Sequence, residues 1–474
     1  MTARHTRDMT ALPELIRGGD EDLPTADLEE RTRTVKHGDY QGGQVVYWMN
    51  REQRLNDNHA LLHAIATADH YSVPVCVAFC LTPQYLDSTL RHYRFMIKGL
   101  MELEGKMRAL GIGFRLLQGL PEVEFPQFLH TVNAGILITD FSPLIPDRVW
   151  KRKVASEIDL PVIEVDSHNI VPCWRLATRR ISTYATFNAR VSPLLGKYLT
   201  NIPAVSRPKV DWTLDQEDID WNAAEANLKI DRSVGEVSWI KPGEEEARKR
   251  LELFLREKLP HYREKSDDPN AEMQSDLSPY LHFGQISAQR VAWEVSKADA
   301  SLEEKGAFFD QLIVRKELAD NFCLHTPDYD TTGAYPIWAR RSLDEHRSDE
   351  REHVYTLQQL ESAQSYDPLW NAAQMEMVKI GKIRGSLRAY WAEKILEWTR
   401  SPEEALFITL YLNNKYELDG NDPNGYTGIA MVIGGLYGRP WRPKEVIGKV
   451  QKLTYTEERL SHDIKSYIER VKSL

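Results

Sequence analysis

Five short apolar runs in the first third of the chain predict β-strands. They are rich in β-branched residues and cover Val45–Met49, Val73–Leu81, Phe114–Gln118, Gly135–Phe141 and Val162–Val165. Stretches with helical periodicity lie between them; in Tyr93–Leu110, for example, apolar residues recur at three- and four-residue spacing. Strands that alternate with helices are typical of a doubly wound parallel sheet. We therefore expect an α/β domain over residues 41–172.

The pattern changes twice beyond this domain. Residues 173–240 are only loosely patterned and include an acidic stretch, Asp211–Asp231, with seven acidic residues and one lysine. This composition predicts an interdomain connector that lies over a surface. After Pro242-Gly243 the chain is helical almost to its end, with segments at Glu244–Leu259, Phe308–Phe322, Gln374–Thr399 and Pro402–Leu412. We expect an all-α domain over residues 241–474 and a flexible polar tail over residues 1–40.

Composition restricts the class of protein. The chain has 474 residues, of which 42% are hydrophobic and 27% are charged, as in soluble globular proteins of two or three domains. No apolar run approaches the length of a membrane span, and the N-terminus has no signal-peptide pattern. The cysteines lack metal-ligand spacing and are typical of reduced core thiols; they are Cys76, Cys80, Cys173 and Cys323. We expect a cytoplasmic protein with no metal site and no membrane contact.

The net charge of −10 is unfavourable for a protein that binds nucleic acid, although one local basic patch is sufficient. A candidate lies between Glu376 and Arg400, where six basic residues stand against three acidic ones. The basic residues are Lys379, Lys382, Arg384, Arg388, Lys394 and Arg400. Such a stripe fits phosphate binding, and it fits a solvated helix face equally well.

The segment Ser278–Ser287 is the most informative part of the chain. It joins a Ser-Pro pair to an aromatic stretch that carries His282 and ends at Gly284. Ser and Pro at the start of a helix leave backbone N–H groups free, and these can bind an anion such as a pyrophosphate. Most Ser-Pro helix starts are caps and nothing more, so this signal is weak without its surroundings.

Read with its surroundings, Leu277 to Gln289 closely resembles the flavin-binding segment of the class II DNA photolyases. Further blocks resemble the same family in the same order, from about Val45 to Leu474. They are Tyr47–Arg51, Asn321–Cys323, Asp367–Asn371, Tyr390–Ala392, Lys394–Trp398, Tyr416–Gly420 and Asp422–Tyr426. The resemblance implies light-driven electron transfer from a reduced FAD, and it implies damaged double-stranded DNA as the partner.

The resemblance also assigns the flavin site residue by residue. It places Tyr262, Ser275, Leu277 and Ser278 on the phosphate and adenine side, Asn413 opposite flavin N5, and Asp419 and Asp422 near the ribityl chain and the ring edge. Without the family, Asn413 would be read as a helix end and Asp419 as part of a turn. The family also allows an antenna chromophore of the deazaflavin or folate type in the N-terminal domain, which has no G-x-G-x-x-G fingerprint.

Three tryptophans predict an electron path. Trp391 and Trp398 are seven residues apart on a helical pattern, so they share a face at an axial separation of roughly 10 Å. Trp370 comes from the preceding segment and is expected between or beside them. Core packing is the commoner role for aromatics at this spacing. The family uses these three positions as its electron chain, entered from Trp391 and left through Trp398.

The chain departs from its family on the side that would face the lesion. Gln311 stands where the repair enzymes have a glutamate, Ala389 replaces a methionine, Met431 a tryptophan, and Tyr437 a histidine. A segment near the end that is basic in the family reads Glu457-Glu458-Arg459-Leu460 in this chain. Gln311 cannot supply a proton, and Ala389 with Met431 removes most of a flat apolar wall against which a flipped-out dimer packs.

We expect repair of cyclobutane pyrimidine dimers in DNA, with Lys382, Arg384, Arg388 and Met431 on the DNA side and Gln311 at the catalytic glutamate position. The alternative is a cryptochrome-like blue-light sensor with an unknown signalling partner and no repair. A third reading, a structural relative without photochemistry, is disfavoured by the intact tryptophan set. We expect a monomer in the cytoplasm, associated with the nucleoid, or in the nucleus of a eukaryote.

Overall fold

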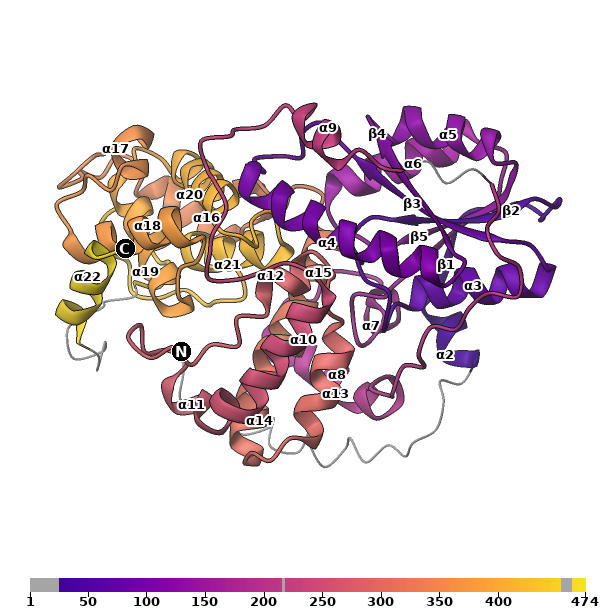
Figure 1. Ribbon diagram of the computed structural model, residues 1–474. Coiled ribbons are helices and arrows are strands. Elements are labelled where there is room, and N and C mark those ends of the chain that lie inside the picture. The colour runs from indigo at the N-terminus through magenta and orange to yellow at the C-terminus, as the bar shows by residue number, and fades with distance from the viewer. Residues whose placement is uncertain (1–24, 215–217, 453–462) are drawn as a thin grey trace.

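A six-stranded sheet organises the N-terminal half (Figure 1). The computed structural model describes residues 25–214, 218–452 and 463–474. The strands are β1 Thr32–Lys36, β2 Gln44–Met49, β3 Val75–Leu81, β4 Gly113–Gln118, β5 Ala134–Asp140 and β6 Val162–Val165, in the order β1-β6-β5-β2-β3-β4. All neighbours are parallel except β1, which is antiparallel to β6. The five predicted strands are confirmed, with small shifts at their ends.

The predicted flexible tail over residues 1–40 is wrong at its C-terminal end. The short helix α2 (Thr25–Glu30) and strand β1 lie within it, and β1 adds an antiparallel edge to the sheet that we expected to be wholly parallel. The cause is the sequence Thr-Arg-Thr-Val-Lys, in which only one residue is apolar, because an edge strand is half exposed. Arg33 of this strand forms an ion pair with Glu164 of β6, which links the two strands where apolar contacts are few.

The two faces of the sheet are covered by different helices, as a doubly wound fold requires. Val45, Tyr47 and Met49 of β2 pack in one cluster with α3 (His59–Tyr71) and α4 (Leu90–Ala109). Val46 and Trp48 point the other way, into a cluster with α5 (Pro121–Thr131) and α6 (Ile145–Glu157). The chain runs outward from β2 to β3 and β4, and then returns to the far side of β2 as β5. The switch point of the sheet is therefore between β2 and β5.

The connector is more structured than its sequence pattern indicates. It contains α7 (Cys173–Leu176), α8 (Tyr184–Tyr198) and α9 (Trp221–Ala226). The buried face of α8, with Phe187, Val191 and Leu195, packs into the helical half. Beyond α8 the chain passes back over the α/β half as an irregular segment that leads to α9 (Figure 1). The boundaries 173–240 remain a prediction.

The remainder is helical. Its elements are α10 Glu244–Leu253, η2 Phe254–Lys258, η3 Leu259–His261, α11 Tyr262–Lys265, α12 Ser278–His282, α13 Ala288–Lys297, α14 Leu302–Phe309, η4 Asp310–Arg315, α15 Lys316–His325, η5 Thr332–Ala334, α16 Ile337–Glu345, α17 Leu357–Glu361, α18 Pro368–Ile380, α19 Gly385–Trp398, α20 Pro402–Tyr416, α21 Pro423–Gly434 and α22 Ile464–Lys472. The predicted segment Gln374–Thr399 is two helices, because Gly381 ends α18 in a left-handed conformation with φ 68°.

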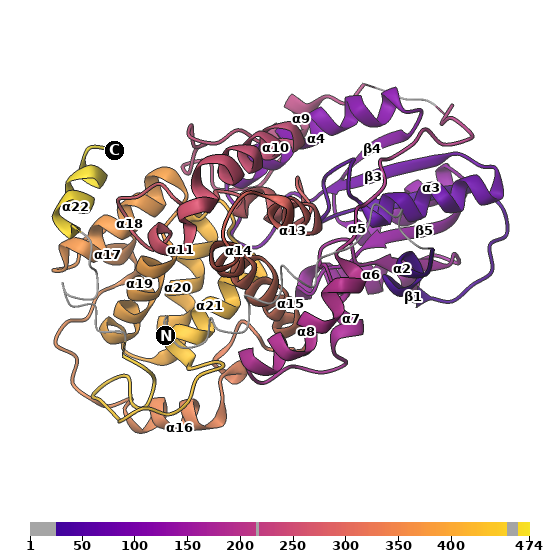
Figure 2. The ribbon, with the colours of Figure 1, turned by 90° about the horizontal axis from the view of Figure 1, so that it is seen from below.

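The α/β and helical halves lie side by side, as the view from below shows (Figure 2). A buried arginine joins them. Arg51, just after β2, donates two hydrogen bonds of 3.2 Å to the carboxylate of Asp320 in α15. A bidentate pair of this kind fixes orientation as well as distance. The segment after α12 also contributes, since Gly284 (φ 64°) lies so close to the Arg51 carbonyl that a Cβ would stand 2.1 Å from its oxygen.

Candidate functional site

The three predicted tryptophans form one continuous row in the helical half. Trp370 of α18 lies between the two indoles of α19. Its ring is nearly parallel to that of Trp391, with centroids 6.5 Å apart and planes 8° apart, and it meets Trp398 at 5.4 Å and 69°. All three side chains are buried. The expectation that Trp370 lies between the other two is thus met by the geometry.

Hydrogen bonds hold the row in register. The indole N–H of Trp391 donates to Gln374 Oε1 (2.8 Å), and that of Trp370 donates to the Trp391 carbonyl (3.0 Å). The backbone N–H of Trp370 donates to Asp367, the N-cap of α18. Each buried indole N–H of the first two tryptophans therefore has an acceptor, so the rings stay in fixed orientations. Helical spacing in α19 and capping of α18 bring residues from two segments into one path.

The predicted flavin residues of two distant segments meet at one cavity. Ser278, the first residue of α12, and Asp419, just after α20, both line it. The other lining residues are Trp239, Asp276, Pro279, Gly381, Lys382 and Glu417. About 200 Å³ of atom-free space lies among these residues, part of it open to solvent.

Asn413 has the property expected of a cofactor ligand. It lies in α20, it is buried, and its Nδ2 donates to Asn414 Oδ1 (3.1 Å). Its Oδ1 is buried and has no hydrogen-bond partner among the described residues. A buried carbonyl oxygen without a donor costs stability, so such an atom indicates a partner that is absent from the protein itself.

Arg388 and Glu417 form the charged part of this site. Arg388 Nη2 lies 3.1 Å from Glu417 and 3.9 Å from Asp419, and its Nε is buried without an acceptor among the described residues. Burial raises the pKa of Glu417 to about 8 against the opposing charge of Arg388. Arg388 therefore has an unused N–H donor, as Asn413 has an unused acceptor oxygen. Sequence reasoning gave Glu417 no role, although it stands inside the Tyr416–Gly420 block.

The other predicted flavin ligands, Tyr262, Ser275 and Leu277, make packing contacts and local hydrogen bonds within the protein. Tyr262 packs edge-on against Phe254 and Phe308, and Ser275 accepts a long hydrogen bond from Leu277 N (3.4 Å). Leu277 is fully buried. Together they shape the wall that precedes Ser278. Whether they touch a cofactor stays a prediction.

Asp422 is held at the junction of the two halves. It caps α21, its Oδ2 lies 3.0 Å from His282 Nδ1, and Arg51 lies 3.9 Å away. Burial raises the pKa of Asp422, but the hydrogen bond and charge of His282 together with Arg51 hold it well below its usual range. This carboxylate therefore stays ionised and links α12, α21 and the end of β2.

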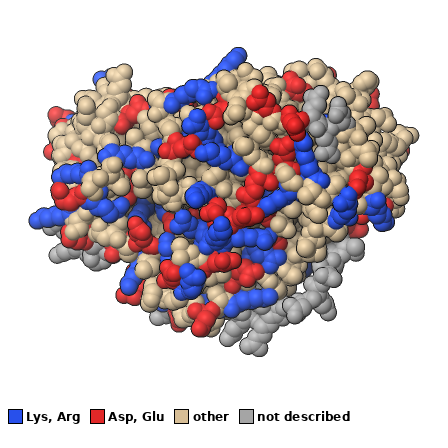
Figure 3. Space-filling model, viewed as in Figure 1, with Lys and Arg blue, Asp and Glu red and all other residues tan. Residues whose placement is uncertain are grey.

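The basic residues predicted to face DNA are engaged within the protein. Lys382 pairs with Asp276, which also binds Lys258 at 2.9 Å, and Arg384 donates to the Ala271 carbonyl (2.8 Å). Arg388 belongs to the cluster with Glu417. Phosphate contact at these positions has to compete with existing partners, and their role toward DNA stays a prediction. On the face seen in Figure 3, Lys and Arg are interspersed with Asp and Glu, and no large field of one sign stands out.

The residues that depart from the family lie in two places. Gln311 is exposed in the π-helical turn η4, beside the cluster that includes Leu312. Ala389 in α19 and Met431 in α21 are half-buried, and Met431 packs against the cluster that holds the tryptophans. Tyr437 touches both clusters, and its hydroxyl is buried without a partner among the described residues. The segment Glu457–Leu460 lies outside the described residues.

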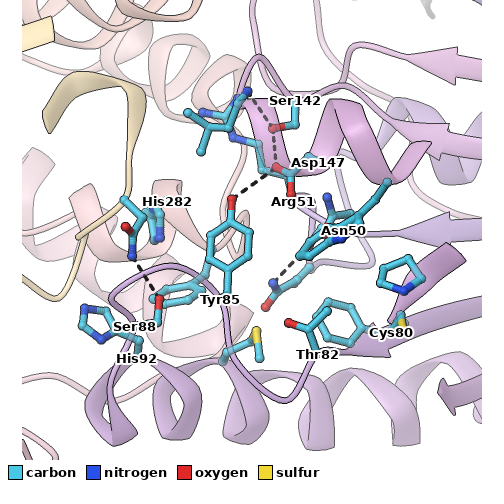
Figure 4. A pocket seen from close by; sticks show the side chains of 18 of the residues that line it. Asn50, Arg51, Cys80, Thr82, Tyr85, Ser88, His92, Ser142, Asp147 and His282 are labelled. Carbon is cyan, nitrogen blue, oxygen red and sulfur yellow. Dashed lines mark hydrogen bonds between the residues drawn. The ribbon is translucent and has the colours of Figure 1, made fainter. Parts of the chain in front are cut away.

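A second and larger cavity lies at the carboxyl ends of the strands, beside the switch point. It has about 840 Å³ of atom-free space, part of it open to solvent. Its aromatic lining is Trp48, Phe79, Tyr85, Tyr93, Trp150 and Phe283, and its polar lining includes Asn50, Arg51, Thr82, Ser88, His92, Ser142, Asp147 and His282. Figure 4 shows Tyr85 near the centre, with Ser142 and Asp147 on one side of it, Ser88, His92 and His282 on another, and Asn50 on a third. Asp422, predicted above as a flavin ligand, also lines this cavity. Sequence analysis named none of the other lining residues as ligands, because strand order was needed to see that they converge.

Asp147, like Asp422, is a buried acid that lines this cavity. It accepts a hydrogen bond from Ser142 Oγ (2.5 Å) and lies 3.5 Å from the Tyr85 hydroxyl (Figure 4). Burial raises the pKa of Asp147 above its ordinary value, while Ser142 and Lys151 oppose the rise. The cavity therefore combines flat apolar walls with a hydrogen-bonding end, as sites for planar chromophores do.

No helix in the described ranges combines the length and apolarity that crossing a bilayer requires. No group of three or more His, Cys, Asp or Glu side chains with a metal-binding arrangement occurs in that same part of the chain. The four cysteines are all buried as free thiols.

Comparison with known proteins gives consistent results. The sequence model of the DNA photolyase family matches residues 45–208. The chain is 42% identical over 450 residues to the deoxyribodipyrimidine photo-lyase of Potorous tridactylus, and this match covers 94% of this chain and 84% of that protein. It is 43% identical over 460 residues to the protein of the same name from Arabidopsis thaliana, covering 94% and 93%. Cryptochrome-1 of Erithacus rubecula is 24% identical and covers 62% of this chain and 50% of its own length.

A solved structure shares the fold. A class III photolyase from Agrobacterium tumefaciens superimposes with a TM-score of 0.69 at 16% identity, over 92% of this chain and 87% of that one. The α/β domain, the connector and the helical region are thus the architecture of a known structural class.

Proposed function

This chain belongs to the class II branch of the DNA photolyase family, and from that premise we propose that it binds FAD and repairs cyclobutane pyrimidine dimers in DNA under blue light. The observation that carries the proposal is the coincidence of sequence and site. Relatives named deoxyribodipyrimidine photo-lyase match nearly the whole chain, and the tryptophan row ends in the same helical half that holds Asn413 and Asp419.

The residues present fit an FAD. Ser278 would face the phosphates from the cavity wall that Ser275 and Leu277 precede, Asn413 would accept a hydrogen bond from the ring, and Asp419 would bind the ribityl side. The unpaired Asn413 oxygen is the strongest support, because a buried acceptor of this kind needs a donor. When bound, FAD supplies the light-excited electron donor that opens the dimer. Tyr262 and Asp422 complete the proposed set as wall and anchor.

The protein residues then have two tasks. The row Trp391, Trp370 and Trp398 would carry an electron inward and keep the cofactor reduced. The buried walls exclude water, which strengthens every charge interaction inside the site. Arg388, held beside Glu417 and Asp419, places a fixed positive charge next to the proposed ring edge.

A second candidate is a blue-light sensor of the same descent. The observation that favours it is the change at Gln311, Ala389 and Met431, since an amide cannot donate the proton that a carboxylic acid can. Against it stand the comparisons, in which the cryptochrome matches are weaker and shorter than those to repair enzymes. Repair is therefore the first proposal and sensing the second.

The cavity at the switch point is proposed as the antenna site. Its size and its aromatic lining suit a planar chromophore, and its position is where open α/β sheets bind ligands. Both expected types, a deazaflavin and a folate, have a planar ring system that the aromatic lining could hold. Damaged duplex DNA is the proposed partner. Because DNA lies in the nucleoid of a prokaryote and in the nucleus of a eukaryote, we propose that the protein acts there.

One assay tests the function. The protein, reconstituted with FAD and reduced, is mixed with an oligonucleotide that contains a thymine dimer, and loss of the dimer is measured by chromatography in blue light and in the dark. Light-dependent loss supports repair. A flavin-loaded protein that photoreduces normally and removes no dimer would exclude repair and leave the sensor.

A further inference from the structure

The aromatic row does not end at Trp398. Two tyrosines continue it, since the ring of Tyr355 lies 5.3 Å from that of Trp398 and the ring of Tyr366 lies 5.7 Å from it. These spacings match those between the tryptophans themselves. Trp398 is only 3% exposed, whereas Tyr366 is 53% exposed. The row therefore reaches solvent through a phenol and not through its last indole.

We propose that Tyr366 is the terminal electron donor of this row, the residue that passes an electron to oxidised Trp398 and is itself reduced by a small thiol or ascorbate-type reductant from solvent. The proposal rests on the proposed electron path and goes beyond it. A buried Trp398 cannot collide with a dissolved reductant, so an exposed redox-active side chain in contact with it is needed to make the charge separation last.

The step balances as one electron and one proton. The Trp398 radical cation takes an electron from the Tyr366 phenol and becomes a neutral indole. The phenol loses its O–H proton to water and becomes a neutral phenoxyl radical. The solvent reductant then returns one hydrogen atom to the phenoxyl. A thiol that does so becomes a thiyl radical, and two such radicals from two turnovers combine to a disulfide.

The backbone around Tyr366 is fixed, although its ring is exposed. Its N–H donates to the Tyr355 hydroxyl (3.0 Å). Ser365, just before it, exchanges hydrogen bonds with Asn371, through Ser365 N to Oδ1 (3.0 Å) and through Nδ2 to the Ser365 carbonyl (2.8 Å). Asp367, just after it, caps α18, the helix that carries Trp370. The phenol is thus anchored on both sides to the segment that holds the middle tryptophan.

The local charges favour movement of the oxidising equivalent outward. The Lys394 ammonium lies 5.8 Å from the centre of the Trp398 ring, where it opposes positive charge on the indole. Lys394 is paired with Glu397 at 2.8 Å, which moderates this effect. Burial raises the pKa of Tyr366, Lys394 opposes the rise, and Asp367 is among the carboxylates that add to it. The phenol is therefore protonated at neutral pH, and its oxidation must release a proton to the adjoining water.

Tyr355 is the less suitable of the two phenols. It is only partly exposed, and its hydroxyl already accepts the Tyr366 N–H. His353 lies against both phenols, with ring centroids 4.2 Å from Tyr366 and 6.1 Å from Tyr355, so it does not separate them. Tyr355 is for this reason a matched control, a phenol beside the same indole with less access to solvent.

The test compares Tyr366→Phe and Tyr355→Phe in the flavin-loaded protein under blue light with a thiol. Illumination in the presence of a nitroso spin trap, followed by peptide mass spectrometry, reports where the radical resides independently of any activity. We expect the adduct on Tyr366 in the parent and its loss in Tyr366→Phe, together with a several-fold fall in the rate of photoreduction. Tyr355→Phe should keep both the adduct and the rate. Tyr366→Trp, which keeps a redox-active ring, should restore the rate.

Three results would overturn the proposal. Parental photoreduction in Tyr366→Phe would mean that the oxidising equivalent leaves elsewhere. Loss of rate and adduct in Tyr355→Phe alone would assign the role to Tyr355. In both cases Trp398→Phe would still impair photoreduction, so the electron path would stand. If Trp398→Phe changes nothing either, the path itself fails, and the role of Tyr366 fails with it.

Discussion

Replacing Trp370 with phenylalanine tests whether the tryptophans conduct electrons or merely fill the core. The substitution removes the middle step of the row. In the parent the longest step between ring centroids is 6.5 Å. Without Trp370 the transfer from Trp391 to Trp398 must span seven residues of α19, an axial distance of roughly 10 Å. Because electron transfer slows exponentially with distance, we expect photoreduction to fall by orders of magnitude.

The same change has a calculable cost in stability. Trp370 is fully buried, and its N–H bond to the Trp391 carbonyl is lost, which costs about 1 kcal/mol. The smaller ring leaves a cavity, so the total should be about 2–3 kcal/mol. A protein with ordinary stability stays folded after such a loss at low temperature. Fold and flavin content should therefore be close to the parent in the cold.

The assay is bleaching of oxidised-flavin absorbance under blue light with an external thiol, with circular dichroism and flavin content measured in parallel. Trp293→Phe is the matched control, since Trp293 is a buried tryptophan of α13 outside the row. It should photoreduce at the parental rate. The reasoning is refuted if folded, flavin-loaded Trp370→Phe photoreduces like the parent, or if Trp293→Phe slows it equally.

Three further predictions concern stability, repair and light harvesting. Burial raises the pKa of Glu317 to about 8 from an ordinary 4.5, so the ionised carboxylate lowers stability as pH rises through this interval. Glu317→Gln should therefore raise the free energy of unfolding by about 3–5 kcal/mol at pH 9 and leave it unchanged at pH 4. Denaturation at both pH values measures this. The triple change Gln311→Glu, Ala389→Met, Met431→Trp should increase binding of dimer-containing DNA over undamaged DNA by roughly tenfold to a hundredfold, measured by titration, with photoreduction unchanged; equal discrimination in the parent would contradict it. Ser88→Trp should fill the switch-point cavity and abolish saturable uptake of an added deazaflavin, seen by absorbance, while FAD content persists; retained uptake would place the antenna elsewhere.

The sheet was predictable because its signal is local. Each inner strand is buried on both faces, so its apolar run is continuous and stands out in the sequence. Strand β1 was not predicted, because an edge strand with one apolar residue has the composition of a polar tail. The partner of its Arg33, Glu164, is more than a hundred residues away in the sequence. The break at Gly381 was missed for a related reason, since one glycine within an apolar periodic pattern is compatible with a continuous helix until its φ is known.

The site divides in the same way. The tryptophan row follows from spacing along one helix together with one capped neighbour, so the sequence contains it. The switch-point cavity does not follow from spacing, because Asn50, Ser142 and His282 converge only through strand order and the packing of two domains. Arg388 was assigned to DNA from a run of basic residues, whereas its partner Glu417 is visible only in three dimensions.

The bidentate bridge between Arg51 and Asp320 also bears on how light energy moves through the molecule. Resonance transfer between two pigments depends on the angle between their transition dipoles as well as on their separation. A bridge that locks one domain against the other fixes that angle. Asp320 lines neither cavity, although its partner Arg51 lines the switch-point cavity. With a chromophore in that proposed antenna site, loosening the bridge would change the yield with which a photon absorbed in one domain excites the other. The optical coupling between the proposed antenna and flavin sites would in that sense depend on an ion pair.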